Sequence, residues 1–325
     1  MYGSISNHTF GKLCDRKNLK NDFKSYFSNV FDVIQKETCL DNQIRSCFDL
    51  FGRIHELTDT PETIKLVTQD VITDFVETDN VRVLELRSTL RELPSRRNYL
   101  ESVIAGIRSF QEKNHEKSEN QTNLIGFLPS IDRRRGVLAA EETVKLAAEF
   151  GCLGVDLSGD PSHGSIDDFG PVLTYAKKFH GLKLAVHFAE YDSDICNQEM
   201  AKVLYDIKPD RIGHGTEIKN HPEHVKYVFE NKIPIESCLT SNLITKTVKD
   251  YDSHHFNFWN EKNHPLVICT DDKGVFNTSL NKEYRLMHDY MNVSVEKLRE
   301  LAKNAVQYSF FEQSEKDSVI ASSFQ

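Results

Sequence analysis

The stretch Leu182-Lys-Leu-Ala-Val-His-Phe-Ala-Glu190 decides the fold, because in it a short apolar run ends in a polar cluster. Six further segments follow the same plan, and their length and β-branched content favour buried strands. These segments are residues 81–88, 124–132, 153–160, 210–216, 233–242 and 265–272. Periodicity alone also allows short buried helices at these places.

Amphipathic helical patterns separate the predicted strands. Over residues 61–76, apolar side chains return at steps of three and four after Pro61, which suits a first helical turn. Similar patterns cover residues 97–111, 141–150, 167–179, 195–205 and 222–231. The alternation of strands and helices predicts a parallel sheet.

Seven strands with polar clusters at their carboxyl ends are typical of a TIM (β/α)8 barrel, here with its first strand absent. A doubly wound open sheet is the alternative, but no glycine-rich phosphate turn follows an early strand. We predict one barrel domain over residues 1–311 and a flexible tail over residues 312–325. Residues 112–123 are predicted to form a charged loop, and residues 18–57 an added helical layer near the barrel mouth.

The composition limits the partners and the compartment. A net charge of −9 over 325 residues argues against nucleic acid or an anionic membrane as the main partner, since both require basic surface. The seven cysteines are odd in number and never spaced as Cys-x-x-Cys, which favours a reducing compartment. No apolar stretch approaches the length of a membrane span. We expect a cytoplasmic monomer.

Titratable residues gather at the ends of three predicted strands. His187 and Glu190 end one strand, His214 ends the next, and Asp271 with Asp272 ends the last. A lone histidine here is more often a hydrogen-bonded core group, and an Asp-Asp pair is more often a turn or helix cap. Their occurrence in order at one rim of a barrel favours a site, and imidazole and carboxylate are ligands that suit zinc.

Four segments resemble the motif set of the adenosine deaminase family: 156–160, 187–190, 213–216 and 270–272. Four more, at residues 84–91, 131–136, 238–242 and 254–259, resemble its adenosine deaminase-like branch, the N6-methyl-AMP deaminases. The resemblance extends over essentially the whole chain from Gly3 onward. It implies a barrel of the metal-dependent hydrolase type that removes methylamine or ammonia from a 6-aminopurine nucleotide, with N6-methyl-AMP as substrate and IMP as product.

The resemblance also implies a role for each motif residue. His187 and Asp271 would be ligands of one Zn²⁺ ion, and Glu190 would protonate a purine ring nitrogen. His214 would orient and help deprotonate the attacking water. Asp272 and the backbone of Gly159 would contact the purine.

In the nucleotide-specific branch, the segment Ser88-Thr89-Leu90-Arg91 would meet the 5′-phosphate through hydroxyls, amides and a guanidinium. His55 and Asp132 would line the nucleotide site. Without the resemblance, residues 88–91 could equally be an ordinary polar loop between a strand and a helix. Deamination of free adenosine is the rival activity, and it would not require this segment.

The chain departs from the family pattern at its start. Family members begin with a strand ending in His-x-His-Leu-x-Gly-Ser-Ile-Ser, whose two histidines complete the zinc site, whereas here Gly3-Ser-Ile-Ser6 follows Met1-Tyr2. His8 lies downstream, on the expected following loop or helix, and does not replace them. We therefore expect weakened zinc binding and exposed strand edges, as in a truncated isoform or an incomplete gene model of an active enzyme. A non-catalytic protein that binds a nucleotide or a partner is the alternative.

Overall fold

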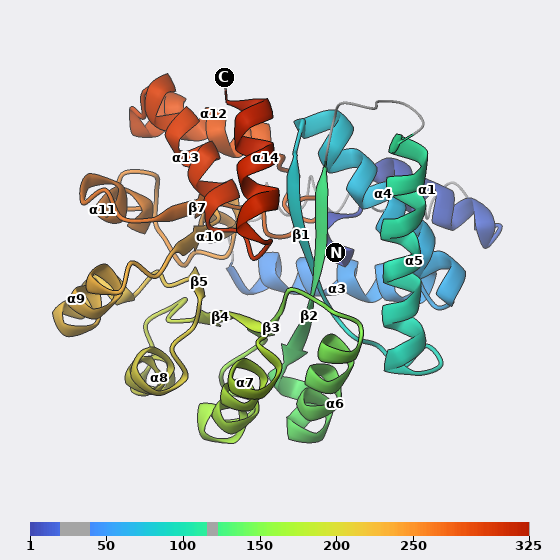
Figure 1. Ribbon diagram of the computed structural model, residues 1–325, viewed down its shortest axis with the longest axis horizontal. Helices are drawn as coiled ribbons and strands as arrows, with labels where there is room; N and C mark the ends of the chain where they lie inside the picture. Colours follow the sequence, from blue (N-terminus) through green and yellow to red (C-terminus); the bar gives the residue numbers. More distant parts are fainter. Residues whose placement is uncertain (20–39, 116–122, 325) are drawn as a thin grey trace.

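The computed structural model describes residues 1–19, 40–115 and 123–324 (Figure 1). Seven parallel strands form one sheet whose spatial order follows the sequence. They are β1 (Val83–Thr89), β2 (Leu124–Asp132), β3 (Gly154–Ser158), β4 (Lys183–Phe188), β5 (Arg211–His214), β6 (Ile235–Ser237) and β7 (Leu266–Ile268). All seven predicted strands are confirmed. The sequential order is that of a barrel and excludes the doubly wound alternative, in which strand order reverses.

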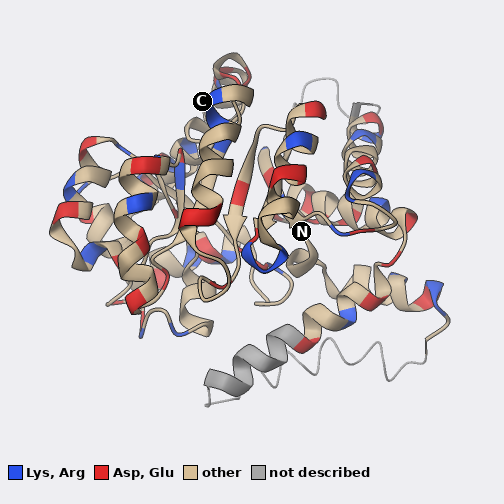
Figure 2. Cartoon of the chain, turned by 90° about the horizontal axis from the view of Figure 1, so that it is seen from below, with Lys and Arg blue, Asp and Glu red and all other residues tan. Residues whose placement is uncertain are grey.

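Helices surround the sheet, and most of them cover its outer face (Figure 1). They are α1 (Asn7–Arg16), α3 (Leu40–Leu57), α4 (Pro61–Asp79), α5 (Arg96–His115), α6 (Gly136–Glu149), α7 (Ile166–His180), α8 (Asp194–Ala201), α9 (Pro222–Glu230), α10 (Leu239–Ile244), α11 (His255–Glu261), α12 (Leu280–Met291), α13 (Val295–Gln307) and α14 (Gln313–Ser323). The six predicted helical patterns are confirmed, and α8 continues as a π-helical stretch over Lys202–Ile207. No helix in the described part of the chain is long and apolar enough to cross a bilayer. Acidic and basic residues intermingle along the outer helices (Figure 2).

Two predicted irregular segments contain helix. Residues 312–325 were expected to be a flexible tail, yet α14 occupies most of them, and Val319 is 1% exposed against Leu124, Val306 and Phe311. A capping box at Glu312 begins this helix, and its buried valine holds it on the barrel. In the predicted loop at 112–123, α5 extends to His115, and residues 116–122 lie outside the described residues.

The predicted helical layer over residues 18–57 is described in part, since residues 20–39 lie outside the described residues. α3 forms its remainder, and Leu50 and Ile54 of that helix are fully buried. They belong to a core that joins α1, α3, α4 and α5 to β1 and β2. A second core packs α6 to α13 on β3 to β7 around Phe169 and Trp259. The layer therefore supports the first strands of the sheet.

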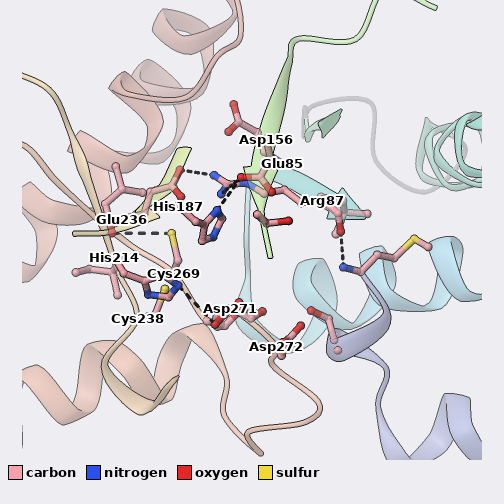
Figure 3. A pocket seen from close by; sticks show the side chains of 18 of the residues that line it. Glu85, Arg87, Asp156, His187, His214, Glu236, Cys238, Cys269, Asp271 and Asp272 are labelled. Carbon is pink, nitrogen blue, oxygen red and sulfur yellow. Dashed lines mark hydrogen bonds and ion pairs between the residues drawn. The ribbon is translucent and has the colours of Figure 1, made fainter. Parts of the chain in front are cut away.

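A network of buried charges lies on the inner face of the sheet. Side chains alternate along a strand, so Glu85 and Arg87 of β1 both point inward. Arg87 pairs with Asp156 of β3 and with Glu236 of β6, and Arg211 of β5 pairs with Glu236 and Glu85. These contacts tie four strands together through their inner faces (Figure 3).

The first residues of the chain lie between β1 and the loop after β7. The Met1 amino group donates to the carbonyl oxygen of Arg87 at 2.6 Å, and Val275 N–H donates to the carbonyl oxygen of Gly3 at 2.8 Å. Within the described residues, β1 and β7 each pair with one strand only. The sheet is therefore a partial barrel that this segment bridges at its carboxyl end.

The charge network predicts a stability effect at Glu236, whose side chain is 5% exposed. Burial alone would raise the pKa of Glu236, but Arg87 and Arg211 outweigh it and hold that pKa at about 2. Glu236→Gln leaves two arginines short of a counter-charge, so the free energy of unfolding should fall by about 3–5 kcal/mol at pH 7. Urea titration followed by circular dichroism measures this.

The stabilisation by Glu236 should also depend on pH. Because the pKa of Glu236 is depressed in the folded chain, its charge stabilises fully above an unfolded-state pKa of 4.5, and the effect declines as pH falls toward about 2. The difference in free energy of unfolding between the variant and the parent should therefore become smaller below pH 4.5. The exposed Glu230→Gln is the matched control and should change stability by less than about 0.5 kcal/mol. Equal stabilities for the two variants would contradict the role of the network.

Candidate active site

A cavity of about 1620 Å³ opens at the carboxyl ends of the strands and continues along the inner face of β1. Every strand of the sheet or the turn after it contributes to its wall. Of the residues predicted to form the site, eleven line it: His55, Ser88, Thr89, Arg91, Asp132, Gly159, His187, Glu190, His214, Asp271 and Asp272. Leu90 does not, because its side chain is 4% exposed and lies in the core beside α4 and α5.

His187 at the end of β4 is oriented by its neighbours on β3. Its Nδ1 lies 2.8 Å from Asp156 Oδ1 and 3.2 Å from the carbonyl oxygen of Leu157. Ser130 Oγ donates to the other oxygen of Asp156 at 2.9 Å. A histidine held at Nδ1 by a carboxylate presents Nε2, which is the usual arrangement of a metal-binding imidazole.

His214 lies beside His187, with ring centroids 5.2 Å apart (Figure 3). Its Nε2 is 4.0 Å from Glu190 Oε1 and 4.0 Å from Asp271 Oδ2. The three residues come from the ends of β4, β5 and β7. The structure thus brings the predicted acid, base and ligand together on one wall of the cavity.

Two residues of α10 position this group. Ser241 Oγ donates to Asp271 Oδ2 at 2.8 Å, and Asn242 Nδ2 lies 3.3 Å from His214 Nδ1. Residues 238–242 belong to a motif of the resemblance, but the motif alone implies neither role. The roles of Asp156 and Arg87 were missed in the same way, because each depends on a partner distant in sequence.

The backbone is strained where the strands meet the site. Ala189, His214 and Asp271 have φ of 52°, 58° and 52°, in the left-handed region that residues other than glycine rarely adopt. Each such residue costs about 1–3 kcal/mol unless its surroundings compensate, and such residues cluster at functional sites. Here they turn the chain sharply, so that successive strand ends face the cavity.

The donors present match part of a zinc site. Imidazole and carboxylate are zinc ligands, so His187 and Asp271 have the required chemistry. Within the described ranges, however, His221, Glu223 and His224 on the outside of the barrel are the set that brings three such ligand atoms within 4.8 Å of one another. His187, His214 and Asp271 therefore do not close a three-ligand set by themselves. His8 is exposed on α1, the helix that follows the first residues.

Asp272 faces the cavity against the first residues of the chain. A Cβ added at Gly3 would lie 1.8 Å from Asp272 Oδ1, so this close approach requires glycine. Burial and the adjacent Asp271 raise the pKa of Asp272 to about 7. Near neutral pH this carboxyl group can therefore either donate or accept a hydrogen bond.

At the opening of the cavity, here called the mouth, Arg91 donates hydrogen bonds to main-chain and side-chain acceptors. Its Nη1 donates to Thr58 O at 2.9 Å, Thr58 Oγ1 at 3.1 Å and Tyr2 Oη at 3.0 Å. Its Nη2 donates to His55 O at 3.3 Å. Burial, with the charges of Arg91, Arg135 and Arg134, lowers the pKa of His55 to about 4, so that its ring is neutral near pH 7. Ser88 lies deeper in the cavity than Arg91, and its Oγ is 2.8 Å from Tyr99 Oη.

Asp132 and Gly159 lie side by side at the ends of β2 and β3. A Cβ added at Gly159, whose φ is 97°, would lie 2.7 Å from Asp132 Oδ1. Asp132 accepts hydrogen bonds from Arg134 N at 3.0 Å and Nε at 2.9 Å. The missing side chain at Gly159 leaves its backbone open to the cavity.

Comparison with known proteins extends the motif resemblance over the chain. The model of the adenosine deaminase family matches residues 1–323. The human N6-methyl-AMP deaminase is 43% identical over 324 residues, covering 95% of this chain and 86% of that protein. The apo structure of the Arabidopsis thaliana N6-methyl-AMP deaminase has a TM-score of 0.84 and 35% identity, covering 99% and 94% of the two chains.

A second solved structure, that of Arabidopsis ADAL complexed with IMP, has a TM-score of 0.83 and 36% identity. It covers 98% of this chain and 92% of that one. The predicted resemblance is thereby confirmed in sequence and in fold. The chain belongs to the adenosine deaminase family.

Proposed function

We propose that this protein is a hydrolytic deaminase of a 6-aminopurine nucleotide, converting N6-methyl-AMP and water to IMP and methylamine. The convergence of His187, Glu190, His214 and Asp271 on one cavity wall carries the proposal. Relatives named N6-methyl-AMP deaminases, about 40% identical, support the choice of substrate.

The chemistry is assigned to the chain's own residues. His214 accepts a proton from the water whose oxygen attacks carbon 6 of the purine, and Glu190 protonates the adjacent ring nitrogen. Methylamine then leaves carbon 6 with the proton that His214 took from the water, the hydroxyl group at carbon 6 loses its proton to Glu190, and the product is IMP. Asp272 and the backbone of Gly159 orient the purine ring between them.

Zinc is the proposed cofactor, with His187 and Asp271 among its ligands. When bound, Zn²⁺ lowers the pKa of a coordinated water to about 7. The geometry of His187, held at Nδ1 by Asp156, supports this role. Because two residues make an incomplete ligand set, a non-catalytic nucleotide-binding protein is the second candidate.

The proposed phosphate site is formed by Ser88, Thr89 and Arg91, which line the same cavity as His55 and Asp132. Leu90 would act there through its backbone alone, since its side chain is in the core. Binding of a phosphate by a guanidinium and hydroxyls favours a nucleotide over free adenosine. We further propose a cytoplasmic monomer, in keeping with the free thiols of Cys152, Cys196, Cys238 and Cys269.

Glu190→Gln tests the chemistry. The variant retains the shape of the side chain but cannot donate the proton, so kcat for N6-methyl-AMP should fall by about 10²–10⁴-fold while KM changes little. Release of methylamine and formation of IMP are measured by chromatography. The exposed Glu261→Gln is the control and should behave as the parent. An unchanged kcat in Glu190→Gln would refute the assignment.

Metal analysis separates the two candidate functions. Zinc content and deamination should be measured on the chain as it stands and with a His-x-His strand added before Met1. If either form of the chain turns over substrate and needs zinc to do so, the deaminase function is supported. His187→Ala should then remove both zinc and turnover. If both forms fold and bind IMP but neither turns over substrate, the non-catalytic candidate takes its place.

Arg91→Met tests the phosphate site. Loss of a charge-assisted hydrogen bond of about 1.5–3 kcal/mol should lower kcat/KM for the nucleotide by roughly 10–100-fold. Activity on N6-methyladenosine, which has no phosphate, should be unaffected, and this comparison controls for damage to the fold. Arg97→Met, which removes an exposed arginine, is the matched control. An equal loss on both substrates would contradict a phosphate contact.

A further inference from the structure

Two cysteines occupy neighbouring positions on adjacent strands below the site. Cys238 follows β6 and Cys269 follows β7, directly after the paired residues Ser237 and Ile268. Cys269 N–H donates to the carbonyl oxygen of Ser237 at 3.0 Å, so the ladder continues to this point. Cys238 and Cys269 therefore lie side by side in register.

Both thiols point into the barrel. Glu236 faces the interior charge network, and side chains alternate along a strand, so Cys238 two residues later faces inward as well. The same alternation takes Val267 and then Cys269 into the cavity, which both of them line together with Cys238. Figure 3 shows the two cysteines between Glu236 and Asp271.

The spacing suits a covalent bond. Neighbouring strands lie about 4.7–4.9 Å apart, and disulfides form between residues whose Cα atoms are about 4.4–6.8 Å apart. Cys238 is 5% exposed, whereas Cys269 is partly exposed at the cavity wall. A small oxidant that enters the cavity would therefore reach Cys269 first, with Cys238 next to it.

We propose that Cys238 and Cys269 are a modification site, a dithiol that peroxide converts to a disulfide. Cys269 sulfur attacks one oxygen of hydrogen peroxide, the O–O bond breaks, and a sulfenic acid and water form. Cys238 sulfur then attacks the sulfenic sulfur, and the second water leaves. Two thiols and one peroxide give one disulfide and two waters, and peroxide is the species reduced.

The bond would act on the site through Asp271. Cys269 precedes Asp271 by two residues, and Cys238 precedes Ser241, which donates to Asp271, by three. Closing the disulfide turns both cysteine side chains toward each other and fixes the ends of β6 and β7 in one arrangement, which displaces this aspartate. Loss of turnover on oxidation rests on the proposed deaminase function, whereas formation of the bond does not.

The first test is made on the full chain without substitution. After treatment with hydrogen peroxide and alkylation of the remaining thiols, mass spectrometry should show the loss of two hydrogen atoms. A tryptic digest should contain residues 233–246 joined to residues 263–273, each of which holds one of the two cysteines. Dithiothreitol should abolish the joined peptide. Peroxide that leaves both thiols free, or that joins other cysteines, overturns the proposal.

Variants and activity make the second test. Cys269→Ser should lose the joined peptide, and Cys152→Ser, which removes another partly exposed thiol, should retain it. In an active preparation of the parent chain, peroxide should lower turnover and dithiothreitol should restore it. Peroxide should leave the turnover of Cys269→Ser unchanged. If the joined peptide forms and turnover is unchanged, the link to Asp271 is wrong. If no preparation is active, the mass readout still decides the site.

Discussion

The rest of the structure depends on the neutralisation of two arginines inside the barrel. Arg87 and Arg211 lie among Glu85, Asp156 and Glu236, on strands distant in the sequence. An unpaired charge in such a place costs several kcal/mol, so the strands must adopt the register that pairs them. Asp156 in turn orients His187, and this joins the requirements of the core to those of the site.

At the carboxyl ends of the strands, next to this charge network, sharp turns of the backbone form the site. Left-handed backbone at His214 and Asp271 directs both side chains to one wall, and α10 supports them through Ser241 and Asn242. The segment from Met1 to Ile5 closes the carboxyl end of the sheet between β1 and the loop after β7. The geometry of the candidate site therefore relies on the first residues of the chain as well as on the strand ends.

Sequence reasoning found the strands because each apolar run ends in a polar cluster, as at 182–190. The helix α14 was missed, because little beyond Val319 and Ile320 marks an apolar face in that segment. Eleven of the residues implied by the motif resemblance line the cavity, but the motifs could not show that the side chain of Leu90 lies in the core beside the helices. Pairs such as Arg87 and Glu236, 149 residues apart, have no local signal.

The hydrogen bonds that hold Arg91 have a consequence for ligand selection at the proposed phosphate site. A free arginine loses about 2 kcal/mol of rotamer entropy when a ligand orders it. Here Thr58, Tyr2 and the His55 carbonyl already fix the guanidinium, so this loss is incurred during folding. A rigid guanidinium cannot follow a displaced anion. If Arg91 binds the phosphate as proposed, this rigidity favours nucleotides with one distance between base and anion over molecules with a longer or shorter spacer.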